Sequence, residues 1–153
     1  MSLETGNIAP DFTAASDDGN VTLSALRGKN VILYFYPKDD TPGCTKEACA
    51  FQAAEADFSG TEAVVLGVSK DSAASHGKFK KKYGLAFPLI SDADGKICEA
   101  YGVWVEKINY GKKYMGIERS TFLIDKQGVV REIWRKVKVD GHAEEVLAAL
   151  KSL

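Results

Sequence analysis

The sequence lacks the features of a secreted or membrane-spanning protein. No basic segment followed by an apolar run opens the chain, so no secretory signal is expected. No apolar stretch approaches the roughly 18 residues that a membrane helix needs. The three cysteines are few and odd in number, which excludes a structural disulfide framework. These absences predict a cytoplasmic protein with no membrane partner, whose thiols stay reduced except during turnover.

An excess of charge of one sign is also lacking. The chain has 20 Lys and Arg and 21 Asp and Glu, a net charge of −1, so no nucleic-acid partner is expected. The one basic cluster, residues 78–82, has Phe79 and Tyr83 at helical spacing and is typical of a solvated helix side. Its 14 glycines form no phosphate-cradling loop, and neither His76 nor His142 has the spacing of a metal site or catalytic triad. No cofactor and no metal are expected.

What is present fits one globular domain spanning residues 1–153, of which 45% are hydrophobic. Strands and helices alternate along the chain and a hairpin and a helix close it, which predicts an α/β fold with a central mixed β-sheet and helices on both faces. This pattern is compatible with a thioredoxin-like fold. The expected strands include residues 30–36, 63–69, 120–124 and 129–134, the expected helices are 45–58, 72–83 and 141–150, and residues 107–116 are expected to form a loop or irregular hairpin.

The segment from Val31 to Cys49 carries the most information. An apolar strand is stopped by Pro37, a polar turn follows, and Pro42 is well suited to open a helix. Cys44 then falls in the first helical turn, where free N–H groups and the helix dipole favour a thiolate. Most free cysteines are simply small buried hydrophobic residues. A strand-to-helix junction, however, is where open α/β sheets place ligand sites, so the sequence predicts a reactive cysteine.

The same residues resemble the active-site segment of a peroxiredoxin, and more narrowly that of the bacterioferritin-comigratory-protein (PrxQ-type) branch. The resemblance runs from about Ile8 to the C-terminus and implies a thioredoxin-like fold. The residues that carry it are Ala9-Pro10-Asp11-Phe12, Pro37, Thr41-Pro42-Gly43-Cys44-Thr45, Glu47, Cys49 and Arg119 within Glu118-Arg119-Ser120-Thr121-Phe122.

The resemblance implies that the Cys44 thiolate attacks the O–O bond of a hydroperoxide and becomes a sulfenic acid. The Thr41 hydroxyl, the backbone N–H groups of Gly43 and Cys44, and the Arg119 guanidinium are then expected to polarise the peroxide. By its sequence alone Arg119 would be a surface ion-pair partner. Pro37 is expected to pack behind the loop and to keep water from the thiolate.

Two roles are open for Glu47. It is either a favourable charge on the helix dipole, or, as the family resemblance implies, the residue that orients the arginine. Cys98 is expected to be a buried packing residue, and Asp39 and Asp40 to be turn residues and no acid/base pair.

The second cysteine, Cys49, is expected to form an intramolecular disulfide with the oxidised Cys44. Reduction of this disulfide then returns Cys44 to the thiol form. In a regular helix, Cα atoms five residues apart are separated by about 8–9 Å, whereas a disulfide needs less than about 7 Å. The helix must therefore unwind. The expected partners are a hydroperoxide, either hydrogen peroxide or an organic one, and a thioredoxin or glutaredoxin-like reductant. No C-terminal arm with a cysteine follows the last helix, so a monomer is expected.

Two other functions compete with a thiol peroxidase. One is a disulfide reductase of the thioredoxin type, although such enzymes normally use Cys-x-x-Cys and here four residues separate the cysteines. The other is a redox-sensing or holdase-type binding protein whose cysteines only switch its shape. Catalytic loss of peroxide, reduction of insulin disulfides and stoichiometric oxidation distinguish the three.

Overall fold

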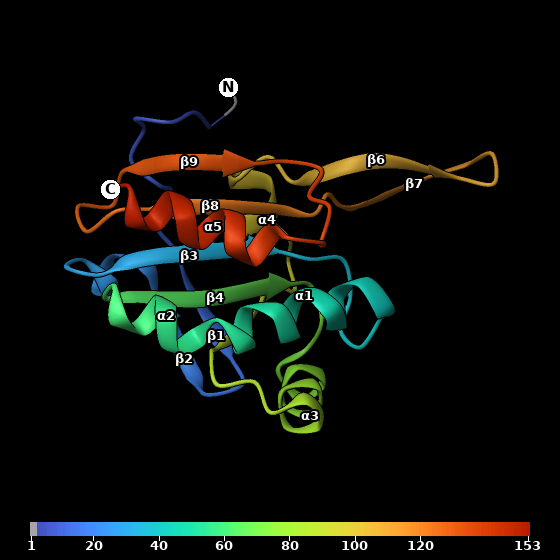
Figure 1. Ribbon diagram of the computed structural model, residues 1–153. Helices are drawn as coiled ribbons and strands as arrows, with labels where there is room; N and C mark the ends of the chain where they lie inside the picture. Colours follow the sequence, from blue (N-terminus) through green and yellow to red (C-terminus); the bar gives the residue numbers. More distant parts are fainter. Residues whose placement is uncertain (1–2) are drawn as a thin grey trace.

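A seven-stranded mixed sheet forms the centre of the computed structural model, which describes residues 3–153 without the side chain of residue 59 (Figure 1). The strand order is β2-β1-β5-β4-β3-β8-β9. Strands β3, β4 and β5 run parallel, while β1, β8 and β9 each pair antiparallel with a neighbour. The strands are β1 (Thr13–Ser16), β2 (Gly19–Thr22), β3 (Asn30–Phe35), β4 (Ala63–Ser69), β5 (Leu89–Ser91), β8 (Ser120–Ile124) and β9 (Val130–Trp134).

The central strand β3 is buried along its whole length. It pairs with β4 on one side and β8 on the other, so its backbone N–H and C=O groups are satisfied within the sheet. Ile32 and Tyr34 point to one side of the sheet, and Val31, Leu33 and Phe35 to the other. This confirms the prediction of a central strand covered on both faces.

Helices cover both faces of the sheet. On one face Phe51, Phe58, Phe79 and Val146 bring α1, α2, α3 and α5 into a common core. On the other face the short helix α4 packs through Cys98, next to the 3-10 turn η1. The predicted α/β fold is confirmed. The helices are α1 (Pro42–Ala53), α2 (Glu55–Gly60), α3 (Ala73–Tyr83), α4 (Lys96–Ala100) and α5 (His142–Lys151), and the turn η1 is Leu23–Leu26.

Two elements differ from the sequence-based expectations. The helix expected over residues 45–58 includes the turn opened by Pro42, as that residue indicated, but it is interrupted at Ala54, where the backbone leaves the helical conformation (ψ 1°). The strand β1 was not predicted, because its four residues carry too little apolar pattern.

The polar segment 107–116 proves to be part of a regular hairpin, β6 (Trp104–Asn109) with β7 (Lys112–Ile117). Its two-residue turn has positive φ at Tyr110 (51°) and Gly111 (78°), the conformation of a type I′ turn, which matches the twist of paired strands. No helix within residues 3–153 is both long and apolar enough to cross a membrane.

Candidate active site

Cys44 lies where the chain passes from the sheet into α1. Strand β3 ends at Phe35, a loop follows, and Pro42 is the first residue of the helix after the N-cap Thr41. Cys44 is thus the third helical residue, as expected, and its side chain is 2% exposed. The first N–H groups of a helix have no intrahelical acceptor. Together with the positive end of the helix dipole, they favour a negative charge at the N-terminus of α1.

Arg119, directly before β8, contacts both Cys44 and Glu47. Its Nη2 donates to Cys44 Sγ at 3.3 Å and its Nη1 to Glu47 Oε1 at 2.7 Å. A planar guanidinium makes two such contacts in fixed directions, and its permanent charge stabilises negative charge on the sulfur. Of the two roles left open for Glu47, this contact favours the one that orients the arginine, and Arg119 is no surface ion-pair partner.

Gly43 leaves room for this approach. A Cβ atom at residue 43 would lie 3.2 Å from Arg119 Nη2, tighter than an ordinary contact. From its sequence context, Gly43 was expected to act only as a backbone donor. Its steric role depends on Arg119, 76 positions further along the chain, and no local pattern indicates it.

Glu47 is almost completely buried, with a 2% exposed side chain. Burial raises the pKa of Glu47 to about 7, although Arg119 acts in the opposite direction. Only one carboxyl oxygen is used, because Oε2 is buried and has no hydrogen-bond partner among the described residues. The proton balance of this carboxyl group therefore changes close to neutral pH.

Two other predicted site residues lie differently from what was expected. The Thr41 hydroxyl donates to the Lys38 carbonyl at 2.9 Å, so the group it leaves free is its oxygen, an acceptor. Pro37 is exposed. This exposure does not fit the expected packing of Pro37 behind the loop, although Tyr36 directly before it is buried.

The other cysteines occupy distinct surroundings. Cys49 is half-buried and lies on α1 with Cys44. Cys98 belongs to the core on the opposite face of the sheet, and burial, aided by Asp92, raises the pKa of its thiol well above the usual range. This placement is that of a packing residue.

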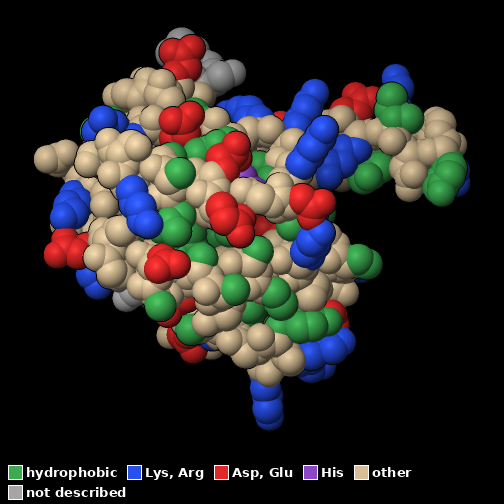
Figure 2. Space-filling model, viewed as in Figure 1, with side chains coloured by type: hydrophobic (Ala, Val, Ile, Leu, Met, Phe, Trp, Pro, Cys, Tyr) green, Lys and Arg blue, Asp and Glu red, His purple; other side chains and the backbone are tan. Residues whose placement is uncertain are grey.

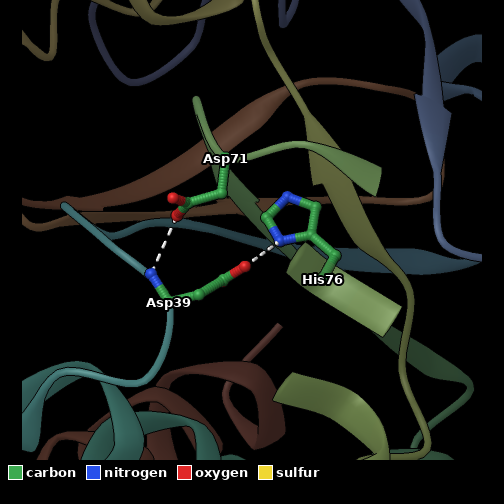
Figure 3. Close-up of side chains that lie close together, drawn as sticks. All are labelled: Asp39, Asp71 and His76. Carbon is green, nitrogen blue, oxygen red and sulfur yellow. Dashed lines mark hydrogen bonds and ion pairs between the residues drawn. The ribbon is translucent and has the colours of Figure 1, made fainter. Parts of the chain in front are cut away.

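A buried polar cluster that no sequence pattern predicts borders the loop before α1 (Figure 3). Asp39, taken for an ordinary turn residue, accepts from His76 of α3, whose Nδ1 lies 2.7 Å from Asp39 Oδ2. The His76 Nε2 lies 2.9 Å from the Ile90 carbonyl, which can only accept. Both ring nitrogens thus lie within hydrogen-bond distance of an oxygen atom. The Asp39 N–H donates to Asp71 Oδ2 at 2.8 Å.

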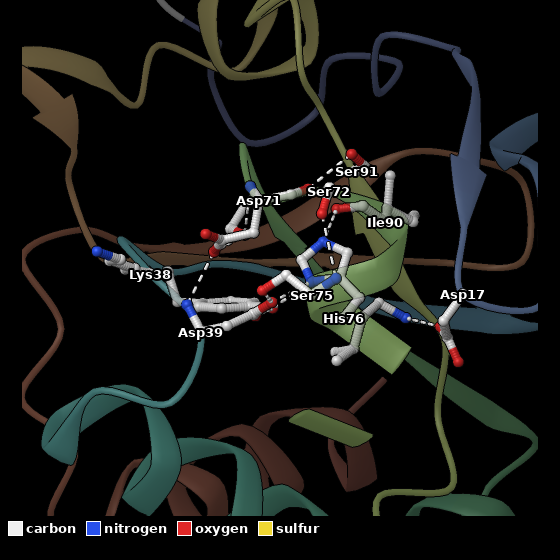
Figure 4. Close-up of polar contacts among 12 residues, drawn as sticks. Asp17, Lys38, Asp39, Asp71, Ser72, Ser75, His76, Ile90 and Ser91 are labelled. Carbon is white, nitrogen blue, oxygen red and sulfur yellow. Dashed lines mark hydrogen bonds and ion pairs between the residues drawn. The ribbon is translucent and has the colours of Figure 1, made fainter. Parts of the chain in front are cut away.

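This cluster fixes the loop to the rest of the structure (Figure 4). Asp39 also accepts from the hydroxyls of Tyr36, at 2.6 Å, and Ser75, at 2.8 Å. Burial raises the pKa of Asp39, but these hydrogen bonds and the one from His76 outweigh it, so the net pKa is lowered. Asp39, Asp71 and His76 offer ligand atoms within 4.8 Å of one another, yet they satisfy each other by direct hydrogen bonds. Their arrangement is that of a structural clamp.

Comparisons with known proteins agree on one family. Residues 5–133 match the AhpC/TSA family. The chain is 58% identical to a putative peroxiredoxin bcp of Coxiella burnetii, over 98% of this chain and 100% of that protein. It is 53% identical to peroxiredoxin Bcp of Bacillus subtilis, over 100% of this chain and 98% of that protein.

Solved structures give the same result. A cysteine variant of Xylella fastidiosa PrxQ superposes with a TM-score of 0.93 at 42% identity, covering 99% of this chain and 98% of that one. Bacterioferritin comigratory protein of Xanthomonas campestris, described for its alkyl peroxide reduction activity, superposes with a TM-score of 0.90 at 49% identity, covering 98% of this chain and 96% of that one.

We predict that Glu47→Gln changes the pH dependence of stability. The pKa of Glu47 is about 7 when folded and about 4.3 in an unfolded chain. The wild type therefore loses stability as pH rises from 4 through 7, whereas the amide does not titrate. Denaturant unfolding of the reduced proteins gives the unfolding free energy of Glu47→Gln minus that of wild type. This difference should be roughly 2–3 kcal/mol larger at pH 8 than at pH 5. The exposed Glu99→Gln is the control; the same pH-dependent gain there, or none in Glu47→Gln, contradicts the prediction.

We also predict strong coupling between Asp39 and His76. Asp39→Ala alone leaves the buried Nδ1 of His76 and the Tyr36 hydroxyl without their acceptor and should cost about 3 kcal/mol of unfolding free energy. His76→Leu alone should cost less, because the Asp39 carboxylate keeps its hydrogen bonds from Tyr36 and Ser75. The double variant removes both partners of the contact and should be more stable than the sum of the single effects predicts. A double-mutant cycle by urea unfolding measures this, and simple additivity would show that the two side chains are not coupled.

Proposed function

Since this chain belongs to the AhpC/TSA family and is a thiol peroxidase of the Bcp (PrxQ) type, we propose that Cys44 is its peroxidatic cysteine and Cys49 its resolving cysteine. The observation that carries this assignment is the contact between Arg119 Nη2 and Cys44 Sγ, at the start of the helix that also contains Cys49. Neither Cys49 nor Cys98 contacts a guanidinium within the part of the chain that the structure describes.

The first step consumes the peroxide. The Cys44 thiolate attacks one oxygen of ROOH, the O–O bond breaks, and the leaving alkoxide takes a proton to become ROH, or water when R is hydrogen. Arg119 stabilises the charge that develops as this bond breaks. The Thr41 hydroxyl donates its own hydrogen to the Lys38 carbonyl, so its oxygen can accept a hydrogen bond from the peroxide O–H group and orient the substrate. Cys44 is left as a sulfenic acid.

The second step forms the disulfide. The Cys49 thiolate attacks the sulfenic sulfur, and the hydroxyl leaves as water. Both cysteines belong to the regular helix α1, so their Cα atoms are about 8–9 Å apart, beyond disulfide reach. The turns around Cys44 must open, while the Asp39–His76 clamp holds the preceding loop.

A dithiol then returns both cysteines to the thiol form. We propose thioredoxin, or a glutaredoxin-like protein, as this reductant, with both hydrogen peroxide and organic hydroperoxides as substrates. The pairing is intramolecular, so one chain completes the cycle, and we propose a cytoplasmic monomer. The relatives named above support a peroxide-reducing activity.

The assay that tests the assignment measures NADPH consumption with thioredoxin, thioredoxin reductase and hydroperoxides. Cys44→Ser should abolish turnover, because no other group accepts the oxygen. Cys49→Ser should react once and stop, with mass spectrometry showing one or two added oxygens on Cys44. Cys98→Ser is the control and should keep the wild-type rate. A Cys44–Cys98 disulfide in the Cys49→Ser protein, or turnover by Cys44→Ser, would refute the assignment.

Amide hydrogen exchange tests the unwinding of α1. The reduced protein should protect residues 45–51, whereas the oxidised protein should lose protection over the first turn or two. The adjoining strand β3 serves as the internal reference and should be equally protected in both forms. Equal protection of residues 45–51 with a confirmed Cys44–Cys49 bond would show that the segment needs no opening.

A further inference from the structure

The hairpin β6–β7, called the arm here, projects from the body of the protein (Figure 1). It forms a two-stranded sheet of its own, separate from the central sheet. Figure 2 shows apolar side chains at its end, away from the core. Tyr110 at the turn is 98% exposed and Tyr114 47%. Two exposed tyrosines on a projecting element are costly for solubility and typical of a contact surface.

The strand register divides the arm into two sides. Lys107 pairs with Tyr114 and Asn109 with Lys112, so these four side chains share one side, which we call the site side. The built geometry agrees, because a Cβ atom at residue 116 would meet both Lys107 and Tyr114 at 3.3 Å. The opposite side carries Glu106, Ile108, Lys113 and Met115.

The arm is connected by the chain to Arg119, whose Nη2 contacts the reactive cysteine at 3.3 Å. Lys107 on the site side is half-buried, and the charges of Arg119, Cys44 and Glu118 act on it besides burial, which lowers its pKa. Strand β7 ends at Ile117, two residues before Arg119. A protein that reaches the sulfur atoms of α1 therefore also meets this side of the arm.

The charged residues of the paired strands on the site side are both lysines. Neither Lys107 nor Lys112 forms an ion pair within residues 3–153, although the Glu118 carboxylate just beyond β7 acts on Lys107. On the opposite side Lys113 pairs with Glu106 at 3.7 Å. Two lysines beside two tyrosines complement a partner surface that is acidic and partly apolar.

We propose that the site side of the arm, with Tyr110 at its tip, is the docking surface for the protein dithiol that reduces the Cys44–Cys49 disulfide. This inference rests on the proposed function. The occupant is a thioredoxin-type protein with an acidic, partly apolar surface around its attacking cysteine.

Docking serves a balanced exchange of two electrons. The partner's thiolate attacks one sulfur of the Cys44–Cys49 disulfide, forms a mixed disulfide and expels the other cysteine as a thiolate. The partner's second thiolate then attacks the mixed disulfide, which releases the reduced enzyme and leaves the disulfide on the partner. A small dithiol performs the same chemistry without touching the arm, and this difference makes the proposal testable.

The test compares two reductants on two matched variants. Tyr110→Asn with Tyr114→Thr removes both tyrosines from the site side and tip, and Asn-Gly suits the type I′ turn, so the hairpin is kept. Ile108→Thr with Met115→Thr removes as many exposed apolar side chains from the opposite side. Thermal unfolding verifies that both variants fold.

With thioredoxin and its reductase, the tyrosine variant should lose about tenfold or more in kcat/KM for thioredoxin, the scale of a lost aromatic anchor. Its rate with dithiothreitol should stay within about twofold of wild type, and the Ile108/Met115 control should behave as wild type with both reductants. Lys112→Glu should also slow the thioredoxin reaction and weaken its dependence on salt.

Four results would overturn the proposal. They are an unchanged thioredoxin reaction in the tyrosine variant, an equal loss in the control, an equal loss with dithiothreitol, and a wild-type dimer that the tyrosine variant converts to monomer. The last would make the arm an interface between copies of this chain. A wild type that turns over peroxide with neither reductant would instead overturn the proposed function, and this inference with it.

Discussion

The double contact of Arg119 is the interaction on which the site depends. Its guanidinium connects the start of β8 to α1, because it donates to both Glu47 Oε1 and Cys44 Sγ of that helix. Because the Glu47 side chain is buried, its charge is acceptable only while the arginine compensates for it. The same arginine stabilises charge on the sulfur. Removing the carboxylate of Glu47 or the sulfur of Cys44 therefore changes how the guanidinium contacts the remaining acceptor. Structure and reactivity are coupled through this one side chain.

The proposed cycle combines a helix that opens with a preceding loop that is held in place. The loop before α1 is held from the other direction by Asp39, whose carboxylate and N–H both bind groups of the β4–α3 region. The first turns of α1 are held by their own hydrogen bonds, by the contacts of Arg119 with Cys44 and Glu47, and by the buried Ala48. In the proposed cycle these turns open, and the contacts with Arg119 must then change with them.

The arm extends the same chain segment outward. Its second strand leads within two residues to Arg119, so a single stretch of chain contributes both the charge at the sulfur and the exposed tyrosines of the arm. The proposed partner contact is therefore linked to the chemistry at the sulfur by covalent connection. The Asp39–His76 clamp joins the loop between β3 and α1 to helix α3.

Features that depend on neighbouring residues could be predicted from the sequence. The apolar pattern of residues 30–36 and 63–69 predicted the central strands, and Pro42 predicted the helix start that places Cys44. The role of Arg119 was available only by family resemblance, since no local pattern separates it from a surface arginine. The Glu47–Arg119 pair, the steric need for Gly43 and the Asp39–His76 clamp join residues 37 to 76 positions apart. Only the tertiary structure decided these, because a buried polar group is stable where a distant partner meets it, and sequence spacing does not say where that happens.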